Sequence, residues 1–168
     1  VKRDRGAVLR IEQVIADRYC AAVLIDFTAP EGTVLDQDYY AFDRSVSATS
    51  RDGVKMQTYG IGWEVLPSST EDETGRHVTI LMTIHSLKGE FNFIGAKVKL
   101  TLDGLYRDNC LEELVVPGRW SCTFTLPETD PGRLCTVNEP IEIDGKNAVL
   151  TTLYVSPLSL TCEIKQGT

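Results

Sequence analysis

Residues 76–86 read RHVTILMTIHS, a stretch in which apolar side chains occupy every second position. These positions are Val78, Ile80, Met82 and Ile84. In an extended chain they project from one side, while the residues between them project from the other. A strand with one face on a core and the other in water produces this alternation. Because strands of parallel sheets are apolar on both faces, the stretch predicts an antiparallel sheet.

The same alternation recurs at 96–102, 120–126 and 158–164. In the last of these stretches, the apolar side ends with Cys162 and Ile164. Each stretch is predicted to be a half-buried strand whose apolar face lies on a core.

Clusters of Gly, Pro and Asp separate the strand candidates at intervals of roughly ten residues. The clearest is IDGK at 143–146, because Asp-Gly tolerates the positive φ angles of a tight hairpin turn. Many short strands with regularly spaced turns are typical of a sandwich or a barrel. We therefore predict an all-β chain: an antiparallel immunoglobulin-like β-sandwich with elaborations and at most one or two short helices.

Two segments also fit helical spacing. The segment 10–25 is either a helix or a hairpin that turns at Asp17, and the β-branched residues on both sides of Asp17 favour the hairpin. The segment 108–116 is a short helix candidate, with Asp108 at its start and a Pro-Gly pair after its end.

The chain has 168 residues, which fits one domain. We expect a single β-sandwich over 1–168, with a division near 103–118 into a larger and a smaller β unit as the alternative. The hydrophobic fraction of 42% and the charged fraction of 24% are ordinary for a globular domain and exclude a disordered or coiled-coil chain.

The net charge of -7 argues against a nucleic-acid partner, because proteins that bind phosphate backbones need a basic face. No run of 18 apolar residues is present, so we expect no membrane span within these residues. The chain opens VKRDR, without a Met and without the apolar core of a signal peptide. We therefore expect Val1 to follow a cut, made either by processing or by loss of an upstream part.

Known catalytic motifs such as GxSxG, GxGxxG and the P-loop are absent from the sequence. His77 and His85 share one side of a strand but lie roughly 26 Å apart along it, so they cannot share a metal ion. The cysteines are Cys20, Cys110, Cys122, Cys135 and Cys162. Their spacing fits no metal site, and we expect structural thiols or disulfides. We predict a protein that is not an enzyme, without catalytic, cofactor-binding or metal-binding residues.

Acidic residues cluster at 36–38, 71–73, 112–113 and 142–144, but none of these clusters fits a calcium loop. We expect them to be solvated loop charges.

The aromatic residues provide the ligand-binding candidates. Trp63 and Trp120 are expected in the core, because each lies among apolar residues of its own face. Tyr39 and Tyr40 are adjacent in an apparent strand, so one of them faces outward and offers a contact surface. Loops 37–51 and 68–75 are the expected interface regions of such a scaffold.

The C-terminal half carries a recognisable order of segments. It contains VKLTLDGLY at 98–106, GRWSCTFTLP at 118–127, a hairpin around 141–145 and LYVSPLSL at 153–160. This order resembles the extracellular part of a family of membrane-anchored proteins of Gram-positive bacteria. Members are often encoded beside extracytoplasmic-function sigma factors and are regarded as their negative regulators.

The resemblance implies a short cytoplasmic segment, one transmembrane helix upstream of these residues and an immunoglobulin-like ectodomain at the cell surface. It assigns no catalytic or ligand residues. We therefore expect a non-catalytic, extracytoplasmic sensor domain with an extracellular ligand or protein partner. The alternative is a cell-surface adhesion or carbohydrate-binding module without a signalling role.

Overall fold

The computed structural model describes residues 1–67, 74–87 and 91–166, and all regular structure within them is antiparallel β-strand. The first sheet contains, in spatial order, β1 (Lys2–Asp4), β2 (Ala7–Ala16), β3 (Cys20–Thr28), β6 (His77–Ser86) and β5 (Tyr59–Leu66). The second contains β4 (Ala41–Thr49), β7 (Lys97–Tyr106) and β8 (Leu114–Thr125). The third contains β11 (Leu160–Gln166), β10 (Lys146–Val155) and β9 (Arg133–Ile143).

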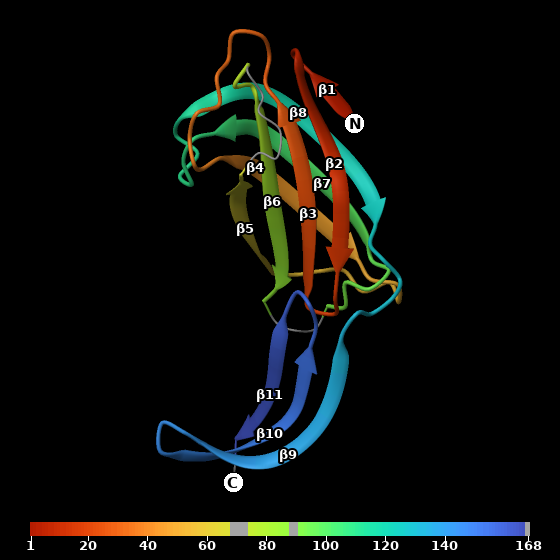
Figure 1. Cartoon of the computed structure of the whole chain (residues 1–168). Helices are drawn as coiled ribbons and strands as arrows, with labels where there is room; N and C mark the ends of the chain where they lie inside the picture. The colour runs from red at the N-terminus through yellow and green to blue at the C-terminus, as the bar shows by residue number, and fades with distance from the viewer. Residues whose placement is uncertain (68–73, 88–90, 167–168) are drawn as a thin grey trace.

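The first two sheets pack face to face and form the predicted β-sandwich (Figure 1). If the strands are lettered from β2, their orders become A-B-E-D and C-F-G, which is the arrangement of a constant-type immunoglobulin domain. The additional strand β1 pairs with the outer edge of β2. The immunoglobulin-like prediction therefore agrees with the strand order of the sandwich.

The sandwich core lies between these two sheets and is rich in aromatic rings. Phe27 from the first sheet packs edge-on against Trp120 and Phe42 from the second, with ring centroids 5.3 and 5.6 Å apart. The apolar side of β6 is buried, as its alternation predicts. Trp120 is buried as expected, whereas Trp63 is half-buried and packs on Phe42 at the margin of the core.

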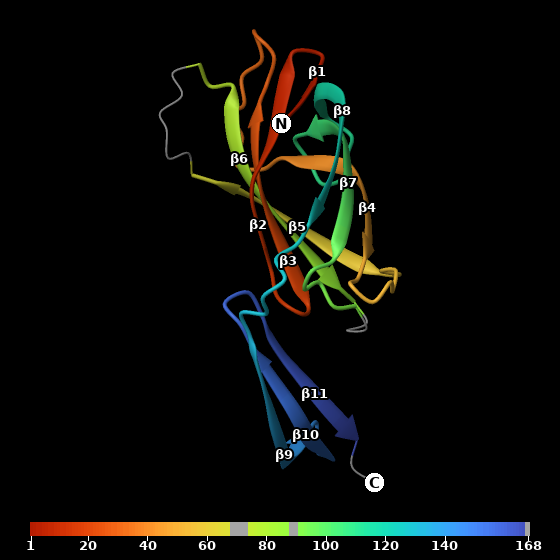
Figure 2. The same cartoon turned by 90° about the vertical axis from the view of Figure 1, so that its right-hand side faces the viewer.

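The third sheet extends from one end of the sandwich, so β11 lies far from β1 (Figures 1 and 2). The third sheet is a β unit separate from the sandwich. Its first strand, β9, begins at Arg133, after β8 has ended at Thr125. The division considered near 103–118 instead falls within β7 and β8 of the sandwich. β7 and β8 pair directly with each other, which keeps both strands in one sheet.

The segment 10–25 forms the β2–β3 hairpin, so the hairpin alternative is confirmed. The helix predicted over 108–116 is wrong. Asp108 does accept backbone N–H groups, from Glu112 and Glu113, but Leu111 adopts a positive φ of 59°. That left-handed residue ends the turn before a helix can propagate. In the described part of the chain, no helix is long and apolar enough to cross a membrane.

Candidate functional site

The third sheet meets the sandwich where the β2–β3 turn lies against the β10–β11 turn (Figure 1). Asp17 lies in the first of these turns and is fully buried. Its Oδ1 accepts the backbone N–H groups of Tyr19 and Cys20, both at 2.7 Å. This is the local geometry that makes Asp a turn-forming residue, since its side chain takes up N–H groups that the turn leaves unpaired.

The second oxygen of Asp17 reaches across to the other turn. Oδ2 accepts the hydroxyl hydrogens of Ser156 and Ser159, both at 2.5 Å. Ser156 Oγ in turn accepts the N–H groups of Leu158 and Ser159 at 2.9 Å, which fixes the shape of the β10–β11 turn. A buried carboxyl group is costly without partners, and these four donors supply them.

A second polar connection runs beside the first. Arg18 Nε donates to Asp130 Oδ2 at 2.5 Å, and the Tyr154 hydroxyl donates to Asp130 Oδ1 at 2.6 Å. The Arg18 guanidinium also lies over the Tyr154 ring, 5.6 Å from its centroid, and the ring of Tyr19 packs edge-on against Tyr154 at 5.1 Å. We refer to Asp17, Arg18, Asp130, Tyr154, Ser156 and Ser159 as the junction cluster.

The electrostatics of the junction cluster follow from these contacts. Burial alone would raise the pKa of Asp130, but hydrogen bonds from Tyr154, Gly132 and Arg18 outweigh it and leave that pKa below its usual range. Burial and the hydrogen bond to Asp130 raise the pKa of Tyr154 to about 12. The hydrogen bond to Asp130 raises the pKa of Arg18.

Position 132 requires a glycine because its backbone lies very close to the ring of Tyr154. A Cβ atom at Gly132 would lie 2.2 Å from both Cζ and Oη of Tyr154. Any larger residue would therefore displace the ring that both Arg18 and Asp130 contact. The polar groups of the junction cluster connect the sandwich to the unit that contains the third sheet.

The two tyrosine candidates lie in different environments. Tyr40 is fully buried in the sandwich core, and its hydroxyl accepts the backbone N–H of Gln37 at 3.2 Å. Tyr39 is half-buried, and its hydroxyl donates to Asn109 at 2.9 Å. Burial raises the pKa of Tyr39. A ligand can therefore approach Tyr39, whereas the ring of Tyr40 is enclosed by protein.

The two histidines lie on β6, as expected. His77 is half-buried and contacts the carboxylate of Asp26 on β3, and His85 is exposed. The contact is diagonal across two neighbouring strands, since His77 lies opposite Thr28 and Asp26 lies opposite Thr79.

All five cysteines lie in the described part of the chain, and all are free thiols. Cys20 is buried, and this burial raises its pKa to about 11. Cys122 is half-buried, and burial also raises its pKa. Cys110, Cys135 and Cys162 are exposed.

The structure brings two of the acidic candidates together around Arg107. Its guanidinium lies 3.8 Å from Asp36 and 3.1 Å from Glu113. The pKa of Asp36 lies below its usual value, mainly because Asp36 accepts a hydrogen bond from Gln37. Within residues 1–67, 74–87 and 91–166, no group of three or more His, Cys, Asp or Glu side chains could hold a metal ion. The acidic residues 71–73, and most of the expected interface loop 68–75, lie outside the described residues.

Sequence reasoning did not identify the junction cluster. Asp17 was expected only as the turn residue of a hairpin. Its partner Ser156 follows 139 positions later, and no local pattern links the two. The sequence contains two relevant signals, an Asp at a hairpin turn and a Ser-rich turn in the C-terminal segment. Nothing in it indicates that these two turns contact each other.

Comparisons with known proteins inform the fold alone. No protein-family model matches the chain, and no curated protein matches it. Among solved structures, the chain is similar to a conserved domain protein from Bacillus anthracis, with a TM-score of 0.67 and 13% sequence identity. The match covers 93% of this chain and 49% of that protein, so this chain spans about half the length of its structural neighbour. At this identity the likeness shows that the two share a fold.

Proposed function

We propose that this chain is the non-catalytic, extracytoplasmic part of a membrane-anchored surface protein and serves as the sensory domain of a negative regulator of a sigma factor. The membrane anchor would be a transmembrane helix outside these 168 residues. The ligand or protein partner would bind at exposed loops of the sandwich. Binding there would be passed to the upstream helix, with the sandwich and the third sheet moving together as one unit.

The observation that carries this proposal is the hydrogen-bonded contact of Asp17 with Ser156 and Ser159. Because the carboxyl group is fully buried and engages both turns, the sandwich and the third sheet are held in one orientation. A sensor needs such a connection, since movement at a binding loop must reach a distant part of the molecule. A simple adhesive module has no such requirement.

The disposition of the chemically reactive side chains also supports a non-catalytic role. The buried thiol of Cys20 has a raised pKa, which disfavours the nucleophilic thiolate form. The proposal therefore depends on binding and mechanical coupling.

The test uses the complete reading frame in its host. We expect one apolar stretch of about 20 residues upstream of Val1, preceded by a short basic segment. We also expect the protein in the membrane fraction with the sandwich outside the cell, and a raised output of the adjacent sigma factor when the protein is deleted. A secretory signal peptide without a membrane helix would overturn the sensor proposal and favour the adhesion or carbohydrate-binding alternative.

The role of the junction cluster is tested by Asp17→Ala in the same protein, with Asp52→Ala at an exposed turn of the sandwich as the matched control. We expect Asp17→Ala to change sigma-factor output at an unchanged protein level, and Asp52→Ala to leave it unchanged. Ser159→Ala removes one hydrogen bond and tests the same connection if Asp17→Ala reduces the protein level. Unchanged output with both junction variants would overturn the coupling role.

A further inference from the structure

The outer side of the second sheet carries an ordered array of small polar and basic side chains. The strands of this sheet pair without a bulge over 43–49 in β4, 97–103 in β7 and 119–125 in β8. Successive side chains of a strand project from opposite faces. The even-numbered positions face the core, as Leu100 and Trp120 show. The odd-numbered positions therefore lie on the outer side, away from the first sheet (Figure 2).

Two neighbouring rows on the outer side each place a lysine between two hydroxyl groups. These rows are Ser47–Lys99–Thr123 and Thr49–Lys97–Thr125. Directly opposed residues of paired strands share a face. Lys55 extends the second row, because it forms an isolated bridge with Thr49. We call the two rows together with Lys55 the lysine face.

The lysine face is open to solvent. Most of its side chains are exposed, namely Lys55, Lys97, Lys99, Ser47, Thr123 and Thr125. The central strand β7 contacts mainly β4 and β8, so no described strand covers this side. Within residues 1–67, 74–87 and 91–166, the ammonium groups of these lysines form no ion pair with a carboxylate. They are therefore available to an anion from outside the chain.

The lysine face lacks carboxylates, although the chain as a whole has a net charge of -7. The next row beyond Lys99 holds only hydroxyl groups, from Ser45, Thr101 and Ser121. The row after that contains Asp43 and Asp103, and Asp103 lies 3.4 Å from the guanidinium of Arg119. The acidic groups of the outer side thus lie at the end of the sheet away from Lys97.

The turns beside Lys97 leave its charge in place. Arg51 and Glu128 both lie within 4 Å of the point where a Cβ of Gly95 would be, so their opposite charges lie close to each other. Asp52 is exposed in the same turn as Arg51. The lysines therefore outweigh the carboxylates at this end of the sheet.

We propose that the lysine face binds a polyol phosphate, a linear polyanion in which phosphodiester groups alternate with hydroxyl-bearing carbon units. Each phosphodiester group carries a negative charge and a pair of non-bridging oxygens that accept hydrogen bonds. Each row of the face supplies an ammonium group with a hydroxyl group on either side of it, and these are side chains that contact phosphate oxygens in proteins. The opposite charges of the face and the polymer also attract before contact.

The spacing of the lysines fits the same polymer. Lys97 and Lys99 are two positions apart on one strand, which separates their Cα atoms by about 6.8 Å. Successive phosphorus atoms of a glycerol phosphate chain are joined by a bent path of about six bonds, each roughly 1.5 Å long. One phosphate can therefore lie on each row, with the polymer running along β7. Lys55 lies about 10 Å from Lys97 across the sheet and adds to the positive field there.

The composition of the lysine face disfavours a nucleic acid or a membrane as its occupant. Proteins that bind single-stranded nucleic acids stack the bases on aromatic side chains, whereas both rows contain only Lys, Ser and Thr. Segments that bind anionic lipid surfaces carry about four to eight basic residues, which is more than this face presents. Its hydroxyl groups instead match a polymer that carries hydroxyl groups itself.

This inference goes beyond the sensor proposal and does not depend on it, because a secreted adhesin could bind the same polymer. Loss of polymer binding would leave the expected membrane anchor untouched. Equally, a reading frame without an anchor would leave the binding measurement untouched.

Binding is measured with the 168-residue chain and a short, fluorescently labelled glycerol phosphate oligomer. Fluorescence anisotropy gives the association constant over a series of salt concentrations. Each phosphate neutralised on a single-stranded polyanion contributes about -0.7 to the slope of the logarithm of this constant against the logarithm of salt concentration. With the lysines of the face engaged, we expect a slope of about -2. The absence of saturable binding at low salt would overturn the proposal.

The double variant Lys97→Ala/Lys99→Ala removes the charge from both rows. We expect at least about tenfold weaker binding at low salt and a slope reduced in magnitude by about 1 to 2, because each lysine contact with a phosphate contributes about 1. The variant Lys97→Arg/Lys99→Arg keeps the charge and should bind within about threefold of the unaltered chain. Both pairs of side chains are exposed, so the melting temperature should not change.

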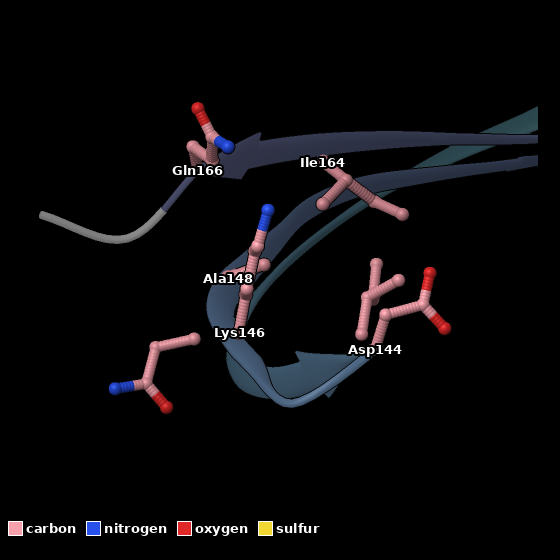
Figure 3. Close-up of a pocket in the computed structure, with 7 residues that line it drawn as sticks. Asp144, Lys146, Ala148, Ile164 and Gln166 are labelled. Carbon is pink, nitrogen blue, oxygen red and sulfur yellow. The ribbon is translucent and has the colours of Figure 1, made fainter.

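The matched control is Lys146→Ala/Lys165→Ala, which removes the same charge from exposed positions of the third sheet. Lys146 lines a depression together with Asp144, so a carboxylate accompanies that lysine (Figure 3). We expect the control to bind the oligomer as the unaltered chain does. An equal loss of binding in the control would show that only the net charge matters and would overturn the assignment to the lysine face.

Backbone amide resonances locate the bound oligomer. We expect the largest shifts at Lys97, Lys99 and Thr123, and shifts confined to other parts of the chain would overturn the proposal. Oligothymidylate, polygalacturonate and phosphatidylglycerol vesicles serve as competing polyanions at equal charge concentration. Each should bind more weakly than the glycerol phosphate oligomer. Equal or tighter binding of any of them through the same lysines would assign the face to that class of partner and overturn the polyol phosphate assignment.

Discussion

The carboxylate of Asp17 accepts a hydrogen bond of 2.5 Å from the hydroxyl of Ser156, although 139 positions separate the two residues in the chain. This contact joins the sandwich to the third sheet, and Ser159 repeats it from the other end of the same turn. The position of the third sheet therefore depends on this buried carboxylate together with the contacts of Arg18, Asp130 and Tyr154 beside it.

Asp17→Ala tests the energetic importance of this contact. The substitution leaves four donors without an acceptor, and we expect it to lower the free energy of unfolding by on the order of 3 kcal/mol. Ser159→Ala removes one neutral partner and should cost about 1 kcal/mol. Urea denaturation followed by tryptophan fluorescence measures both. A loss below roughly 0.5 kcal/mol for Asp17→Ala, the range of ordinary surface substitutions, would contradict the assignment.

Gly132→Ala tests the close approach to Tyr154. Because the added Cβ would lie 2.2 Å from the Tyr154 ring, we expect a loss of about 1 to 3 kcal/mol, typical of an overpacked site. Gly53→Ala is the control, since Gly53 has open space around it and only its positive φ of 83° opposes a side chain. In a protein that also carries Tyr154→Leu, Gly132→Ala should lower the free energy of unfolding by less. An equal loss in both proteins would show that the added Cβ does not act through the Tyr154 ring.

The raised pKa of Tyr154 predicts a loss of stability at alkaline pH. In the folded protein this pKa is about 12, whereas an unfolded tyrosine titrates near its ordinary value of about 10. The neutral phenol is thus favoured by folding, so its contribution is complete below about pH 10 and is lost as the pH rises through about 12. Unfolding by urea at several alkaline pH values measures the slope. The slope should be smaller in Tyr154→Phe, and an identical slope would contradict the prediction.

Cys20 is predicted to be unreactive in the folded protein. Its pKa of about 11 leaves roughly a thousandth of the thiol ionised at pH 8, and the side chain is buried. Cys110, which is exposed, should react with a thiol reagent in the native state. We expect Cys20 to react only in denaturant, as measured by peptide mass spectrometry. Native labelling of Cys20 at the rate of Cys110 would show that its surroundings open readily.

The sandwich was predictable because period-two alternation is a local property of each strand. The residues around 76–86 show it clearly, and β6 buries the expected side. The turn at 143–146 was predictable for the same reason, since Asp144 and Gly145 both adopt positive φ angles. The failed helix at 108–116 shows the limit of local signals, because the same Asp108 that could cap a helix instead closes an irregular turn.

The candidate site depended on information that local patterns do not contain. Tyr39 and Tyr40 are neighbours in the sequence, but packing against the core encloses Tyr40 and leaves Tyr39 accessible. The partners of Asp17 could not be found by spacing, because each turn is complete in itself and the contact arises only when the sheets meet.

The alternation in 158–164 marked Leu160, Cys162 and Ile164 as one side of a strand, and that much follows from the residues alone. The structure confirms the strand but leaves this apolar side open instead of on a core. Periodicity tells which side of a strand is apolar, since that depends on neighbouring residues in the chain. Whether that side becomes buried depends on segments remote in the chain, and so its exposure was decided only by the tertiary arrangement.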